Sequence, residues 1–167
     1  MKLGMNEYGS MGKMILKINK ELYSFTFAER GTLYENNKYP LGYKFINEPV
    51  SYIFDPDSGI VCESGTDDAE AIEDPIVFPS VTRREVQKEY IKSLDDNNLN
   101  DIFKGLDKKE YWDTFWQYFD DGGEKFSAFG MFEKRYRINK IINWCEENNI
   151  PYYIDKKDEF IKKIFEE

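Results

Sequence analysis

The order of two hydrophobic patterns most constrains what this chain can fold into. Before Pro79 the apolar residues form short runs separated by Gly, Pro and Asn, as in antiparallel strands. After Pro79 they recur at the three- and four-residue spacing of amphipathic helices. Strands followed by helices, with no repeat or linker between them, predict an α+β fold in which N-terminal antiparallel strands and hairpins precede a C-terminal helical half.

Two pairs of strands are predicted before Pro79. The first pair covers residues 14–18 and 22–27, and Tyr23, Phe25 and Phe27 share one face of the second strand. The second pair covers residues 50–54 and 60–62, joined by an Asp-Pro-Asp-Ser-Gly turn. Residues 28–44 are predicted to be a loop because Gly, Asn and Pro interrupt them.

Five helices are predicted after Pro79. Thr82 and Glu85 have capping-box spacing and begin the first, which runs to about Leu94. Asp107 is predicted to cap a helix through Phe119, and Asp155 to cap the terminal one. The remaining predicted elements are helices over 98–104 and 131–147 and a strand over 151–154.

The chain has 167 residues, the usual size of one domain. Residues 1–12, rich in Met and Gly, are predicted to be a flexible leader, and residues 13–167 a single α+β domain. Twelve Tyr, thirteen Phe and three Trp provide enough large apolar side chains for a packed core. We therefore expect Trp112, Trp116 and Trp144 to be mostly buried.

The length of the apolar stretches and the spacing of the cysteines predict where the protein is located. No stretch approaches the length of a membrane span, and the N-terminus lacks the apolar core of a signal peptide. Cys62 and Cys145 have no metal-binding spacing and are expected to be buried, reduced thiols. We expect a cytoplasmic protein that makes no membrane contact; its oligomeric state does not follow from the sequence.

Histidine is absent from the chain, which excludes catalytic triads, Cys–His pairs and nearly all zinc or iron sites. The chain also lacks the Gly-rich motifs that bind phosphates or dinucleotides. We therefore expect no enzyme activity, no cofactor and no metal site. A carboxylate–metal enzyme, using a pair such as Asp120 and Asp121, is kept as a third hypothesis.

The negative charge of the chain is concentrated in one stretch. Residues 45–82 contain nine acidic residues and no Lys or Arg, whereas the other 23 acidic residues are balanced by 23 basic ones. We call residues 66–74, an expected exposed loop or short helix, the acidic segment. It is either a solvated surface or a docking face for a basic partner. Its candidate binding residues are Asp67, Asp68, Glu70, Glu73 and Asp74.

Basic and aromatic residues in the helical half suggest a different partner. The candidate nucleic-acid contacts are Arg83, Arg84, Lys134, Arg135 and Arg137. Helical spacing does not place Lys134, Arg137 and Lys140 on one narrow stripe, so ion pairs within the protein are the simpler interpretation. The aromatic run from 111 to 119 could stack on bases, but its wide apolar arc is more typical of a buried helix.

A group of short segments resembles a known family: 54–61, 78–80, 91–94, 112–119 and 143–150, together with Phe132 and Arg135. Through them about two thirds of the chain, residues 52–150, resembles a bacterial family of uncharacterised proteins, UPF zero-one-five-eight. In two places the chain departs from the family: Lys108-Lys109-Glu110 replaces a basic Gly-Lys-Gly-type segment, and the N-terminal strands have no clear counterpart. The resemblance implies a related fold and no particular activity.

Three functions are compatible with these patterns. The first is a small acidic, non-catalytic binding protein, an inhibitor or immunity-type factor that neutralises a basic toxin, nuclease or other nucleic-acid enzyme. The second is a nucleic-acid-associated regulator that uses the Arg and Lys residues named above. The third is the carboxylate–metal enzyme. The size, acidity and missing catalytic motifs favour the first.

Overall fold

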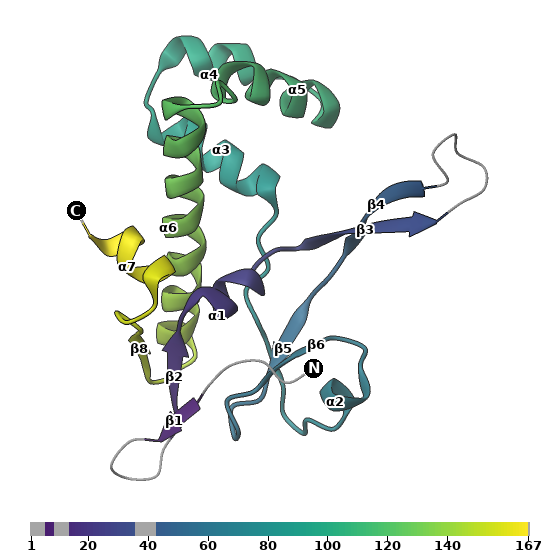
Figure 1. Ribbon diagram of the computed structural model, residues 1–167, viewed down its shortest axis with the longest axis vertical. Helices are drawn as coiled ribbons and strands as arrows, with labels where there is room; N and C mark the ends of the chain where they lie inside the picture. Colours follow the sequence, from purple (N-terminus) through teal and green to yellow (C-terminus); the bar gives the residue numbers. More distant parts are fainter. Residues whose placement is uncertain (1–5, 9–13, 36–42, 167) are drawn as a thin grey trace.

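The computed structural model describes residues 6–8, 14–35 and 43–166, and within these the fold is α+β as predicted. Helix α6 (Glu124–Glu147) runs along the length of the molecule (Figure 1). The strands and the shorter helices gather around it. The other helices are α1 (Lys20–Ser24), α2 (Asp67–Glu70), α3 (Arg83–Ser93), α4 (Asn97–Phe103), α5 (Lys108–Phe119) and α7 (Glu159–Phe165).

The described strands form three small sheets. In the first, β2 (Met14–Ile18) pairs antiparallel with β1 (Asn6–Tyr8) and parallel with β8 (Tyr152–Ile154). In the second, β5 lies between β6 and β7 and pairs antiparallel with both. The third is a ribbon of β3 and β4 that extends away from α6 (Figure 1). These last strands are β3 (Glu29–Glu35), β4 (Tyr43–Pro49), β5 (Tyr52–Phe54), β6 (Val61–Glu63) and β7 (Ile76–Val77).

The structure corrects two predictions in the N-terminal part. Residues 22–27 are not a strand, because the Asn19 side chain accepts a hydrogen bond from the Leu22 amide and caps helix α1. The stretch 28–44 is not a loop throughout, because residues 29–35 form β3 and residues 43 and 44 begin β4. Residues 36–42 lie outside the described part. Residues 6–8 of the predicted leader form β1, and its remaining residues are also outside that part.

The helix caps predicted from the sequence are largely confirmed. Thr82 caps α3 and Asp107 caps α5, each by accepting a hydrogen bond from the amide three residues later. Helix α7 differs, because Asp158 rather than Asp155 accepts from the Phe160 amide. Helix α6 begins at Glu124 rather than near residue 131. There the Asp121 carboxylate accepts hydrogen bonds from three nearby amides, which lower its pKa.

Buried apolar side chains of the described residues form two clusters along α6. The lower core joins β2, α1, the β5–β6 hairpin and α7 to the C-terminal half of α6, which contributes Ile138, Ile141 and Cys145. The upper core joins α3, α4 and α5 to the N-terminal half of α6 through Phe129. Glu133 and Arg137 are buried on α6 between Phe129 of the upper core and Ile138 of the lower core, and with Thr26 they form a buried polar layer.

The prediction that the three tryptophans are mostly buried is correct for Trp144 and Trp116 and wrong for Trp112. Trp116 is partly buried, whereas Trp112 is 45% exposed. Helix α5 packs on the upper core through Tyr111, Phe115 and Phe119, which recur every four residues. Trp112 lies about 100° around the helix from Tyr111, outside this buried face.

Candidate functional site

The acidic segment is exposed and held in place by its N-terminal cap. The Thr66 hydroxyl donates to the Glu63 carbonyl (2.7 Å) and accepts from the Ala69 amide (3.3 Å), while the Ala69 side chain is buried. These contacts fix helix α2 against β6. All five candidate docking residues are exposed: Asp67, Asp68, Glu70, Glu73 and Asp74.

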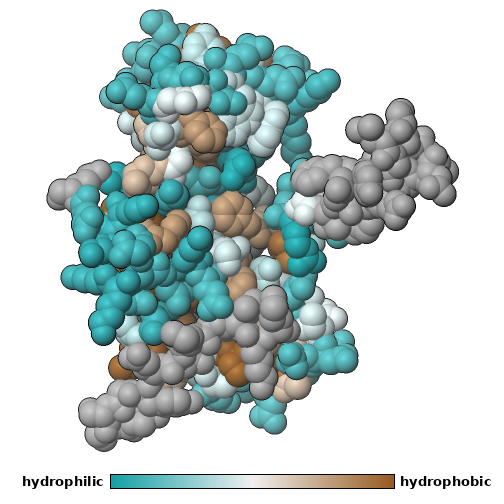
Figure 2. Space-filling model, in the orientation of Figure 1, coloured by the Kyte–Doolittle hydropathy of each residue, from teal (hydrophilic) through white to brown (hydrophobic). Residues whose placement is uncertain are grey.

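The acidic segment lies at the opposite end of the molecule from α4 and α5 (Figure 1). On the face seen in Figure 2, hydrophilic residues at this end lie beside more apolar ones. Val77 follows the segment closely in the chain and is 69% exposed on strand β7. Arg30, on β3, reaches the neighbouring strand β6, where its guanidinium pairs with Glu63 at 2.8 Å. This end therefore combines exposed carboxylates with one exposed aliphatic side chain.

The candidate nucleic-acid residue Arg137 is fully buried, which corrects its assignment to a binding surface. Its Nε and Nη2 donate to Glu133 Oε2 at 3.2 and 3.0 Å, and Nη1 donates to the Thr26 and Val81 carbonyls. Burial lowers the pKa of Arg137, and the charge of Glu133 opposes this shift. Arg83 shares Glu133, with Nη2 lying 3.3 Å from Oε1.

The other three candidate nucleic-acid residues contact different elements. The Arg84 guanidinium lies over the Tyr111 ring of α5, 5.1 Å from its centre. Lys134 and Arg135 instead face α7, where Lys134 lies over the Phe160 ring and Arg135 donates to the Ile164 carbonyl. The structure thus brings Arg83 and Arg137 together but does not gather all five residues into one basic face.

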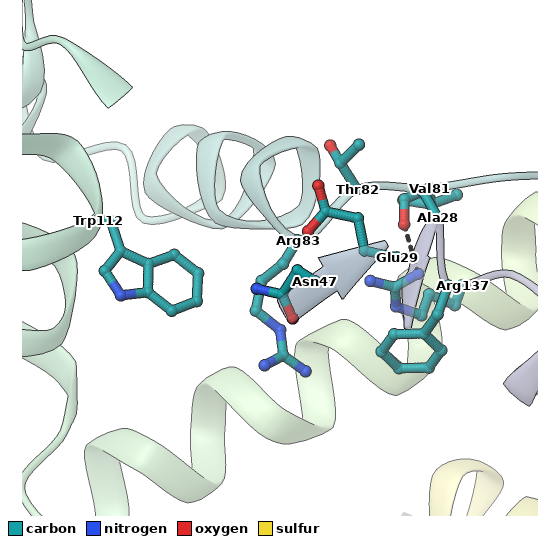
Figure 3. A pocket seen from close by; sticks show the side chains of 9 residues that line it. Ala28, Glu29, Asn47, Val81, Thr82, Arg83, Trp112 and Arg137 are labelled. Atoms are coloured by element: carbon teal, nitrogen blue, oxygen red, sulfur yellow. Dashed lines mark hydrogen bonds between the residues drawn. The ribbon is translucent and has the colours of Figure 1, made fainter. Parts of the chain in front are cut away.

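Two adjoining hollows lie between the β3–β4 ribbon and helices α3, α5 and α6. Their volumes are about 560 and 230 Å³, and both are lined by Glu29, Thr82, Arg83 and Trp112. We call them together the Arg83 hollow. Trp112 lies on one side, and Arg83 and Arg137 lie toward the other (Figure 3). Phe27, Ala28, Asn47, Val81 and Arg137 line the larger part, and Arg84, Gln87 and Lys108 line the smaller.

Gln87 is the unusual residue of the Arg83 hollow. Its side chain is fully buried, yet neither Oε1 nor Nε2 has a hydrogen-bond partner among the residues that the structure describes. Leaving a buried amide unsatisfied costs about 1–3 kcal/mol. Sequence reasoning missed this hollow because its lining comes from five distant segments. The one available signal in the sequence was Gln87 itself, a polar residue among the apolar residues that form the buried face of α3.

Cys62 and Cys145 are buried and form no disulfide, as the sequence predicts. Burial raises the pKa of the Cys145 thiol to about 12. The reactive thiolate is therefore scarce at any pH well below 12.

We expect Cys145 to resist iodoacetamide at pH 8 in the folded protein and to react once the chain is unfolded in urea. Mass spectrometry of the labelled peptide measures this difference. Rapid labelling of Cys145 in the folded protein would contradict its place in the lower core.

Two further features of the described residues bear on function. Across residues 6–8, 14–35 and 43–166, no three acidic or cysteine side chains gather as a metal ion would require. Nor does any helix in these ranges have the length and hydropathy to cross a membrane. In comparisons with known proteins, no protein-family model, curated protein or solved structure matches the chain. The resemblance to the family UPF zero-one-five-eight therefore stays a prediction.

Proposed function

We propose that this protein is a non-catalytic binding protein that docks on a basic partner protein through the acidic segment. The observation that carries the proposal is the exposure of all five carboxylates on a segment fixed by the Thr66 cap. Such a surface attracts a basic protein before contact and so accelerates correct encounters. An inhibitor or immunity-type factor that neutralises a basic toxin or nucleic-acid enzyme would work in this way.

Several features support a protein partner at this end of the molecule. The stretch 45–82 contains no Lys or Arg, so its carboxylates gain no basic neighbour from within it. Val77 offers an aliphatic contact next to the charges, and interfaces commonly combine apolar contacts with a charged rim. Thr66 and Ala69 hold the backbone, which lowers the entropy lost on binding.

Neutralising the acidic segment is expected to slow association by roughly tenfold at low salt while leaving the melting temperature nearly unchanged. The variant carries D67N, D68N, E70Q, E73Q and D74N. A partner is first recovered from the native host by pull-down and identified by mass spectrometry. Surface plasmon resonance then measures its association rate with the parent and the variant, at low salt and at about 0.5 M salt, where exposed charges are screened.

A matched control removes five negative charges elsewhere. It carries D95N, D101N, D113N, E147Q and E166Q, all at exposed positions outside the acidic segment. We expect this control to associate at close to the parent rate, because local charge rather than net charge steers the partner. Equal association rates for the two variants would show that the acidic segment is only a solvated surface.

A further inference from the structure

The Arg83 hollow is rich in positive charge on a chain whose net charge is −9. Arg83, Arg84, Lys108 and Arg137 line it, whereas Glu29 is its one lining carboxylate and Glu133 contacts Arg83 and Arg137. The Asp107 carboxylate also interacts electrostatically with Arg84. Four cations therefore face three carboxylates, which leaves an excess of one positive charge. This balance favours an anionic ligand, and Arg83, with its guanidinium side chain still 42% exposed, is placed to contact it.

One wall of the hollow is a flat aromatic ring. Trp112 is 45% exposed, and its ring meets that of Trp116 edge to face at 5.6 Å between ring centres. An exposed indole beside arginines is a stacking platform for a planar ring, and stacking on a base contributes about 1–3 kcal/mol. Figure 3 shows Trp112 across the hollow from Arg83 and Arg137.

Gln87 provides the third feature, a buried amide with an unused donor and an unused acceptor. A Gln side chain pairs in two-point fashion with a ring edge that carries an adjacent donor and acceptor, as nucleic-acid bases do. Arg84 and Lys108 line the same part of the hollow, and their long side chains can turn aside to admit such an edge. Binding would then satisfy the amide.

From these three features we infer that the Arg83 hollow is a nucleotide-binding site. The base stacks on Trp112 and pairs with the Gln87 amide, while the phosphate contacts Arg83. The combined volume of the two parts falls in the usual range of small-ligand sites. The site is separate from the acidic segment and does not depend on the proposed docking function.

Titration of the parent protein with each of the four ribonucleoside monophosphates tests the inference. We expect calorimetric binding of at least one nucleotide, accompanied by quenching of tryptophan fluorescence that the Trp112→Phe variant loses. Inorganic phosphate serves as the control for charge alone. Single-stranded RNA hexamers distinguish a free nucleotide from one recognised within a strand; binding of either, with the same dependence on Trp112, supports the site.

Two substitutions test separately how much the Arg83 charge and the Gln87 amide contribute to nucleotide binding. Arg83→Gln is expected to weaken nucleotide binding about tenfold or more, because it removes a charged hydrogen-bond donor. Lys92→Gln removes the same charge at the far end of α3, outside the hollow, and is expected to leave affinity unchanged. Gln87→Leu is expected to weaken binding by a similar factor while raising the melting temperature of the free protein, because it removes the unsatisfied buried amide.

The opposite pattern of results overturns the inference. Failure of all four nucleotides and the hexamers to bind at millimolar concentration would exclude the site. Phosphate binding as tightly as the nucleotides would show that no base is recognised. Unchanged affinity in Gln87→Leu, with folding confirmed by its melting curve, would show that the amide is not part of a binding site.

Discussion

Replacing Arg137 by Met is expected to lower the free energy of unfolding by about 3–5 kcal/mol, the range for breaking a buried ion pair from one side. Arg137 is fully buried, and Glu133 is 8% exposed. Without Arg137, the Glu133 carboxylate keeps only the two longer hydrogen bonds from the partly exposed Arg83, both at 3.3 Å. These contacts do not offset the cost of removing the Glu133 carboxylate from water, so the folded state is destabilised.

The same substitution also disconnects three parts of the fold. The Arg137 guanidinium donates to the Thr26 carbonyl at 3.1 Å and to the Val81 carbonyl at 2.8 Å. These contacts tie α6 to the segment after α1 and to the segment before α3. They lie in the polar layer between the two cores, so their loss is expected to reduce the cooperativity between the cores as well as the stability.

Urea unfolding followed by circular dichroism measures the effect, with Lys140→Met as the control. Lys140 lies on the same helix and pairs with Glu85 at 3.3 Å, but its side chain is 43% exposed. We expect its loss to cost less than about 1 kcal/mol. The double variant Glu133→Leu with Arg137→Met should recover part of the lost stability, because no buried charge is then left unpaired. Arg83 also loses Glu133, but its side chain is 42% exposed to water. Equal stability of the two single variants would contradict a structural role for Arg137.

The sequence predicted the elements whose local signals agree with their tertiary contacts. Thr82 and Asp107 are strong N-caps that precede clear apolar periods, and both helices begin where predicted. The hairpin of β5 and β6 follows from its Pro-containing turn. Cys145 was placed in the core because it continues the apolar stripe of α6, and it is fully buried.

The predictions failed where two local patterns compete or where burial depends on distant contacts. Tyr23, Phe25 and Phe27 alternate like a strand, but the Asn19 cap and the i, i+3 pair of Leu22 and Phe25 favour a helical turn with both side chains buried.

Burial of Arg137 could not be predicted from its own helix. Its carbonyl partners come from residues 26 and 81, which only the folded chain brings together. The Arg83 hollow was missed for the same reason, because five segments build it.

Trp144→Ala is expected to cost about 3–5 kcal/mol, whereas the same change at exposed Trp112 should cost less than about 1 kcal/mol. Trp144 meets the rings of Phe54 and Phe78 edge to face, each at 5.1 Å between ring centres, and its Nε1 donates to the Val77 carbonyl at 2.9 Å. It therefore holds the β5–β6–β7 sheet against α6. Alanine would leave a cavity between sheet and helix and remove the Val77 hydrogen bond.

The contrast between the two tryptophans also tests the assignment of Trp112 to a binding surface. Both substitutions remove the same atoms from a helix, so intrinsic helix propensity contributes equally and the difference reports burial. Urea denaturation of the two variants and the parent gives that difference directly. Similar losses at both positions would place Trp112 in a core and remove the stacking wall of the Arg83 hollow. A large loss at Trp144 alone leaves the Trp112 ring free for a ligand, since folding does not require it.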